Sequence, residues 1–185
     1  MLKSLTLSAW LCAAALPAFS APWTVDDSTR IQVDVSYLGR VVKVVFDEVN
    51  GAIDFDPKRP EATRADIRVK TKSAETGLGL VNGLVKSRDY LNARNHPEIR
   101  FVLQKLKVTG PSSAKVTGEV TLLGVTKPTT LDAKLTKLGP DKNTPAEAGF
   151  LLTGEIDRAA HGNTTGIPQV SQVLPVRIQL SMKPK

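Results

Sequence analysis

The stretch GEVTLLGVTKPTTLDAKL, residues 118–135, alternates apolar and polar side chains on both sides of Gly124 and Pro128. Apolar residues at every second position are typical of a β-strand with one buried face. A proline has no amide hydrogen, and this loss does least harm at the first residue of a strand. We therefore predict a hairpin in which Gly124 ends one strand, residues 125–127 turn, and Pro128 begins the next strand.

The same period of two continues along most of the chain. Glycine and proline residues separate the alternating runs, as expected for turns between strands. Together with the two halves of the hairpin, these runs predict about eight or nine strands. The runs lie at residues 31–37, 41–46, 52–56, 65–73, 98–103, 149–156 and 174–182.

One segment, ETGLGLVNGLVKSRDYLN at 75–92, breaks this period. Its apolar residues recur mostly at every third or fourth position, the spacing that lines one face of a helix. The glycines within the segment weaken that helix, because each costs about 1 kcal/mol relative to alanine. We expect a short or broken helix whose apolar face is buried. That face contains Leu80, Val81, Leu84, Val85, Tyr90 and Leu91.

Many half-buried antiparallel strands with a single helix fit either a two-layer sandwich or a closed barrel. A barrel of about eight strands encloses either packed side chains or one small ligand, and a helix laid over an open end would seal it. The inward residues are mostly Val, Leu and Ile. Such residues suit an elongated apolar cavity and a solid core equally well, so the pattern leaves both alternatives open.

The first twenty residues have the layout of a secretory signal peptide. Lys3 precedes an apolar run that ends at Pro17, and small residues follow. An uncleaved membrane anchor is the alternative, but the run is shorter than the roughly 20 residues that span a bilayer. We predict a signal peptide at 1–20, one mature domain at 21–185, and a periplasmic or secreted location. Loss of Cys12 with the signal would leave no disulfide and no thiol chemistry.

The chain is basic. It has 25 Lys and Arg against 18 Asp and Glu, a formal net charge of +7, and the basic residues are spread along the sequence. Outside the cytoplasm we expect no nucleic-acid partner. A diffuse positive charge suits peripheral contact with an anionic membrane or an acidic ligand, although a solvated basic surface explains it more simply.

The sequence contains no pattern that argues for catalysis. Its two histidines, His96 and His161, are far apart and lack His-x-x-x-His spacing, so a metal site would lack its usual ligands. The acidic run DFDPKRPEATRAD at 54–66 lacks the regular spacing of a calcium loop. We therefore expect no enzyme activity, no metal and no other cofactor.

Two stretches resemble the YceI-like family. VTGEVTLLGVTKPTTLDAKL, residues 116–135, is similar to the family's most recognisable segment, and SAETGLGLVNGLVKSRDYLNARNHPEIRF, residues 73–101, is similar to its helix and the strand that follows. These are exported bacterial proteins with a lipocalin-like barrel that binds isoprenoids or other long-chain lipids. The resemblance implies a mainly β fold, an antiparallel lipocalin-like β-barrel of about eight strands with a short helix capping one end.

The chain departs from the family pattern where contacts with a ligand headgroup are expected. Tyr37 stands where the family often has a histidine, and the segment RAAHG keeps Arg158 but has His161 at an aromatic position. Lys86 and Arg158 are the cations expected near a polar or anionic head, which a guanidinium can hold through two parallel hydrogen bonds. The alternatives are a surface role for Lys86 and a cross-strand salt bridge for Arg158. The headgroup candidates are Tyr37, Lys86, Arg158 and His161.

The leading hypothesis is a noncatalytic binder or carrier of a long-chain lipid or polyisoprenoid. The alternative is a structural or stress-related envelope protein whose barrel is filled by its own side chains, and a lipid hydrolase or isomerase has least support. The oligomeric state stays open, with a homodimer among the alternatives. The residues expected to line the cavity are Ile53, Phe55, Leu80, Leu84, Tyr90, Phe101, Leu122, Phe150, Ile156, Val176 and Ile178.

Overall fold

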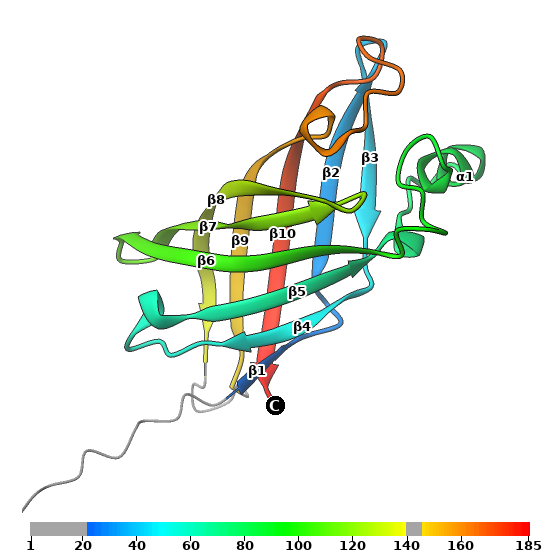
Figure 1. Ribbon diagram of the computed structural model, residues 1–185. Coiled ribbons are helices and arrows are strands. Elements are labelled where there is room, and N and C mark those ends of the chain that lie inside the picture. The colour runs from blue at the N-terminus through cyan, green and yellow to red at the C-terminus, as the bar shows by residue number, and fades with distance from the viewer. Residues whose placement is uncertain (1–21, 140–145) are drawn as a thin grey trace, which may run out of the picture.

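The computed structural model describes residues 22–139 and 146–185, which form ten strands and one α-helix (Figure 1). Short 3₁₀ turns are η1 (Pro60–Ala62), η2 (Thr71–Ser73) and η3 (Ala159–His161). The helix α1 (Gly79–Lys86) lies between β5 and β6 in the chain. The strands are β1 (Pro22–Val25), β2 (Arg30–Tyr37), β3 (Arg40–Phe46), β4 (Val49–Asp54), β5 (Arg64–Lys70), β6 (Glu98–Gly110), β7 (Ser113–Leu122), β8 (Val125–Leu138), β9 (Ala148–Asp157) and β10 (Val173–Pro184).

Eight of these strands close into a barrel. The hydrogen-bonded order runs from β1 through β4, β5, β6, β7, β8 and β9 to β10, and β10 pairs back onto β1. All pairings are antiparallel. The hairpin of β2 and β3 joins β10 beyond β1, because β10 is long enough to pair with both (Figure 1). The expectation of an antiparallel barrel of about eight strands is confirmed, and the two-layer sandwich is excluded.

The hairpin expected at 118–135 exists, but the predicted place of the proline is wrong. Leu122 pairs with Val125, so the turn has only two residues, and both have positive φ, 53° and 78°. Pro128 is the fourth residue of β8 and lies opposite Glu119. Hydrogen-bonded and non-hydrogen-bonded pairs alternate from the turn, which turns the proline nitrogen away from β7. Pairing of β8 with β9 begins only at Asp132, so no ladder bond is lost.

The helix is short, as expected, with eight residues. None of its side chains is buried, so the expectation of a fully buried apolar face is wrong for α1. It lies to one side of the barrel, near the end where the β2–β3 hairpin projects (Figure 1). None of the described helices is long and apolar enough to cross a membrane. The signal peptide predicted at 1–20 lies outside the described residues.

The barrel is closed where β1 pairs with both β4 and β10. Trp23 packs edge-on against Phe55 with ring centroids 6.0 Å apart, and Phe55 meets Phe150 in the same way at 5.5 Å. The indole Nε1 of Trp23 donates a 3.0 Å hydrogen bond to the carbonyl oxygen of Phe55. Met182 from β10 lies fully buried in the same cluster. This cluster ties the first described strand to the last one.

Candidate ligand-binding cavity

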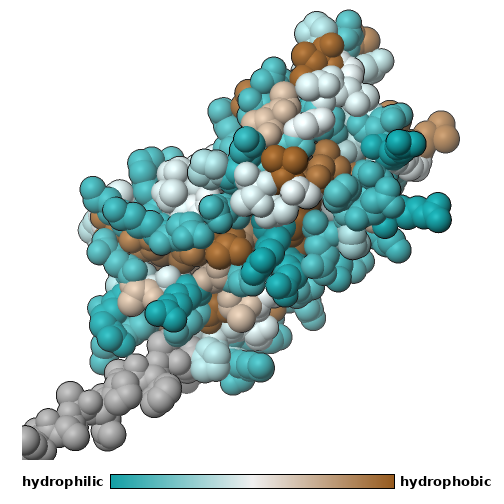
Figure 2. Space-filling model, in the orientation of Figure 1, coloured by the Kyte–Doolittle hydropathy of each residue, from teal (hydrophilic) through white to brown (hydrophobic). Residues whose placement is uncertain are grey.

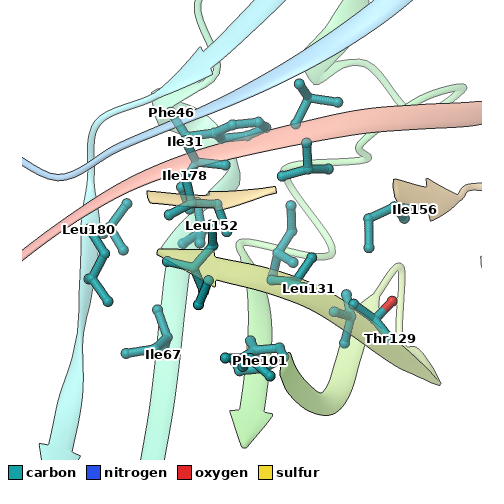
Figure 3. Close-up of a pocket in the computed structure, with 18 of the residues that line it drawn as sticks. Ile31, Phe46, Ile67, Phe101, Thr129, Leu131, Leu152, Ile156, Ile178 and Leu180 are labelled. Atoms are coloured by element: carbon teal, nitrogen blue, oxygen red, sulfur yellow. The ribbon is translucent and has the colours of Figure 1, made fainter. Parts of the chain in front are cut away.

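The interior of the barrel contains a cavity of about 720 Å³. Every strand except β1 contributes wall residues, and so do α1 and the loop after β9. Figure 3 shows Ile67, Phe101, Leu152 and Ile178, each from a different strand, pointing toward one common space. This volume lies within the range of sites that hold small molecules.

The inward side chains do not fill this interior. Along β10 the side chains that face the cavity are only half-buried, while those between them are exposed on the outside. The residues of this inward row are Leu174, Val176, Ile178 and Leu180. Phe101 on β6, also on the wall, is likewise only half-buried. Tightly packed cores leave few voids larger than a water molecule, so this barrel is not a solid core.

Ten of the eleven residues expected to line a cavity lie on its wall. Leu80 does not: the prediction was wrong, because its side chain is 95% exposed on the outer face of α1. Val81 and Val85 are the half-buried residues of the helix that face inward, and Leu84 lies at the border, on the wall but largely exposed. The apolar stripe of α1 is therefore wider than the part of it that packs on the barrel, and sequence spacing alone could not show which part is covered.

The four headgroup candidates divide into two pairs. Tyr37 and Arg158 lie on the cavity wall, and Tyr37 is more than half exposed at the end of β2. Lys86 and His161 are not on the wall, so their predicted place at the cavity was wrong. Lys86 forms a 2.7 Å ion pair with Glu75 outside the barrel. His161 is buried, and its Nδ1 lies 2.9 Å from the carbonyl oxygen of Val125.

Arg158 is the only charged residue on the wall formed by the described residues. It is 4% exposed, and its guanidinium donates to the carbonyl oxygens of Val170 (3.0 Å), Ser171 (2.8 Å) and Asn163 (3.3 Å). A fourth hydrogen bond, of 2.6 Å, goes to the Oδ1 of Asn163. A guanidinium has five N–H donors, so one is left. The expected two-bond grip on a phosphate or carboxylate is therefore wrong for this arrangement.

These contacts give Arg158 a structural task that sequence reasoning missed. The guanidinium donates hydrogen bonds to three backbone carbonyl groups of the loop between β9 and β10, a segment that contains no β-strand. Its partners are carbonyl and amide oxygens and it forms no ion pair with a described carboxylate, so the alternative of a cross-strand salt bridge is not found there either. Burial lowers the pKa of Arg158, while Tyr90 and Asp157 act in the opposite direction. The result is a desolvated cation at one end of an apolar cavity.

Asn163 is a wall residue that the sequence did not single out as a ligand contact. Its Nδ2 donates 2.8 Å to the carbonyl oxygen of Tyr90, and its Oδ1 accepts from Arg158, so it joins the β9–β10 loop to the segment after α1. Tyr90 lies on the same part of the wall. A buried asparagine in an irregular loop has no periodic signal, so only the folded loop could identify it.

Within the described residues, no group of three or more His, Cys, Asp or Glu side chains could hold a metal ion. The arrangement consists of one long apolar wall with few polar groups near Arg158. It can hold an apolar molecule and contact a polar atom at one end of it.

Known proteins resemble this chain in sequence. A family model described as a YceI-like domain matches residues 23–182. The chain is 32% identical over 160 residues to a UPF0312 protein of Pseudomonas savastanoi pv. phaseolicola, covering 84% of this chain and 83% of that one. It is also 32% identical over 135 residues to Protein YceI of Escherichia coli O157:H7, covering 73% and 70%.

Solved structures share the fold. The crystal structure of Burkholderia cenocepacia BcnA superposes with a TM-score of 0.76 at 20% identity, covering 85% of this chain and 98% of that one. A polyisoprenoid binding domain from Saccharophagus degradans gives a TM-score of 0.68 at 16% identity, covering 88% and 98%. At these identities the likeness concerns the fold alone.

Proposed function

Because the chain belongs to the YceI-like family, we propose that it binds and carries a long-chain apolar molecule, an isoprenoid or another lipid, inside its barrel. The observation that carries this proposal is the cavity of about 720 Å³ with a nearly continuous apolar wall of aliphatic and aromatic side chains. A hydrocarbon chain can bind in such a space at little cost in free energy. Burying apolar surface is favourable, and most of the wall has no polar groups that would have to be desolvated. The alternative, a barrel filled by its own side chains, does not agree with a cavity of this size.

The shape of the wall favours an extended ligand over a compact one. The lining runs from Val108 and Leu138 near one end of the barrel to Tyr37 and Val170 near the other. The name of the Saccharophagus degradans neighbour supports an isoprenoid as a candidate ligand. We place the polar head near Arg158, where the remaining N–H can donate one hydrogen bond to a hydroxyl, carbonyl or acidic oxygen.

We propose that this role is noncatalytic and is performed in the periplasm or outside the cell. The wall offers no nucleophile paired with a base: Arg158, its one charged residue among those described, is held by protein oxygens. The layout of residues 1–20 supports an exported protein.

The experiment is a binding assay on protein stripped of lipid with organic solvent and refolded. A fluorescent polyene fatty acid serves as the probe, and a long polyprenol serves as the competitor. Wild type should bind the probe and release it to the polyprenol. Ala133→Trp on β8 places an indole in the cavity and should weaken binding about tenfold or more, because a filled space cannot accept the chain.

The matched control is Lys134→Trp. Lys134 follows Ala133 in β8, and its side chain faces the outside of the barrel. Its affinity for the probe should equal that of wild type. Urea unfolding shows whether each variant is folded, and Ala114→Trp on β7 provides a second way to block the cavity. A folded Ala133→Trp protein that binds as tightly as wild type would refute the proposed binding site.

A further inference from the structure

We propose that the end of the barrel formed by the β2–β3 turn and α1 docks on the surface of an anionic lipid bilayer. Docking would let the protein exchange its apolar ligand with the membrane, and in this respect the inference rests on the proposed function. Docking is supported by apolar exposure and charge on the outer surface of the molecule, and by the continuity of that surface with the cavity wall.

Large apolar side chains are exposed mainly at this end. Ten such residues are exposed in the described parts of the chain, and six of them lie on two short segments, 37–41 and 78–84. Leu38 in the turn is 66% exposed, and Leu80 on α1 is 95% exposed. Figure 2 shows brown, hydrophobic residues at the projecting hairpin and again over α1. We call this set of six residues the docking face: Tyr37, Leu38, Val41, Leu78, Leu80 and Leu84.

The docking face is continuous with the cavity. Tyr37 and Leu84 belong both to the exposed set and to the cavity wall. Val42 and Val81, next to exposed residues of each segment, also line the cavity. A ligand that left the barrel between these segments would therefore stay on apolar surface until it reached the outside. Exposed apolar patches of this kind mark sites of contact with membranes or other partners.

Charge favours a bilayer as the occupant of this face. Segments 37–44 and 71–97 together contain six cations and two acids, a net charge of +4. Of these cations only Lys86 forms an ion pair with a described residue. Arg40, Lys43 and Arg88 are exposed and have no such partner. Basic residues beside exposed apolar ones are the composition of surfaces that bind anionic headgroups and insert apolar side chains.

The same charges disfavour a second copy of the chain on this face. Two copies placed face to face would each present a net positive charge to the other, and like charges at an interface oppose association. The outer edge of β3 is paired only at Val45, with Glu75. Lys43 lies on the unpaired part of that edge, and an edge lysine hinders strand pairing between molecules.

The test is sedimentation of the whole mature chain with vesicles of phosphatidylglycerol and phosphatidylcholine, with pure phosphatidylcholine vesicles in parallel. Wild type should bind the anionic vesicles more tightly, and salt should weaken that binding. Leu80→Asp should lower the partition coefficient about tenfold or more, because it removes a buried leucine from the bound state. The substitution is safe for folding, since the side chain has almost no contacts with the barrel.

Matched controls show whether binding depends on the docking face or only on the net charge of the protein. Ala62→Asp adds the same charge on exposed η1 and should reduce binding far less than Leu80→Asp does. Arg40→Gln with Lys43→Gln should weaken binding about 25-fold, or about fivefold for each cation. Lys105→Gln with Lys107→Gln removes the same charge from exposed positions on β6 and should have a smaller effect.

Each other outcome overturns the proposal. If wild type ignores anionic vesicles, or if Leu80→Asp and Ala62→Asp behave alike, this face does not dock on a bilayer. If light scattering shows a dimer that Leu80→Asp dissociates without vesicles, the face belongs to a second copy. Ligand retention is measured separately, so a protein that keeps its lipid but ignores vesicles refutes docking and leaves the carrier proposal standing.

Discussion

The two ends of the barrel use apolar side chains in opposite ways. At the β1 end, Trp23 and Phe55 are less than a tenth exposed and pack ring against ring. At the α1 end, Leu38 and Leu80 stand in solvent, and the edge of β3 is largely unpaired. Both ends border the same cavity. The β1 end therefore supplies packing that stabilises the barrel, whereas the apolar side chains at the α1 end remain exposed, as the proposed docking requires.

The largest effect is expected from the aromatic cluster. Trp23→Ala removes the ring that packs on Phe55 and leaves the carbonyl oxygen of Phe55 without its donor. Loss of a buried aromatic side chain costs about 3 to 5 kcal/mol, so urea unfolding should show a loss of that size. A loss below about 1 kcal/mol would mean that the β1 end does not carry the stability assigned to it.

A smaller loss is expected at the opposite end, in the β9–β10 loop. Arg158→Met keeps most of the side-chain volume but leaves the carbonyl oxygens of Val170 and Ser171 without a donor. Buried groups left unpaired cost about 1 to 3 kcal/mol. The control, Arg177→Met, changes an exposed arginine on β10 and should alter the free energy of unfolding by less than about 0.5 kcal/mol. Equal losses in the two variants would show that Arg158 does not organise the loop.

Substitution of two glycines compares how closely atoms are packed around the barrel wall and around the helix. A Cβ at position 118 on β7 would lie 2.5 Å from the carbonyl oxygen of Val102 and would also overlap the ring of Phe101. Gly118→Ala should therefore cost about 1 to 3 kcal/mol. A Cβ at position 83 on α1 would meet no atom within 4 Å, so Gly83→Ala should add up to about 1 kcal/mol of stability. A gain from the first change or a loss from the second would contradict this contrast.

The smallest effect is electrostatic and lies where β1 meets β10. Lys183 donates 2.8 Å to Asp26, and the amide of Ser28 donates 3.0 Å to the same carboxylate. These contacts, that of Lys183 first, hold the pKa of Asp26 well below its usual value. The stability they add is present above the unfolded pKa of about 3.9 and is lost as the pH falls through the lower native pKa.

Because the Lys183 side chain is 54% exposed and that of Asp26 is 29% exposed, the pair lies at the surface and Asp26→Asn should cost at most about 1 kcal/mol at pH 7. Urea midpoints of wild type and variant should converge as the pH falls below about 4. Asp47→Asn, at an exposed aspartate without an ion pair to a described residue, is the control and should change little at any pH. If the difference in urea midpoint between wild type and Asp26→Asn stays the same from pH 7 to below about pH 4, the lowered pKa of Asp26 does not contribute to stability.

Most of the barrel could be predicted from the period of two, because each strand has one face toward the cavity and one toward solvent. The runs at 31–37 and 174–182 correspond closely to β2 and β10. β1 was not predicted as a separate strand, since four residues give too short a pattern. The error at Pro128 has a different origin: alternation does not show which part of a strand edge lacks a hydrogen-bonded neighbour, and Pro128 lies on such a part of β8.

The site was less predictable than the fold. Ile178 and Phe101 could be assigned to the interior because strand alternation fixes the direction of a side chain. Leu80, Lys86 and His161 belong to a helix and a loop, where spacing gives a face but not its neighbour. The carbonyl contacts of Arg158 join residues from an irregular segment, and no periodic pattern describes such contacts.

Native mass spectrometry of the protein isolated under mild conditions would show directly whether the barrel carries a ligand. We expect a complex of the mature chain with one apolar molecule. Organic extraction should remove this molecule, Ala133→Trp should lose it, and Lys134→Trp should keep it. Phe101→Ala, which enlarges the cavity, should still carry the molecule. A wild-type protein that emerges free of any lipid, and that stays free after incubation with polyprenols and long-chain fatty acids, would contradict the carrier function.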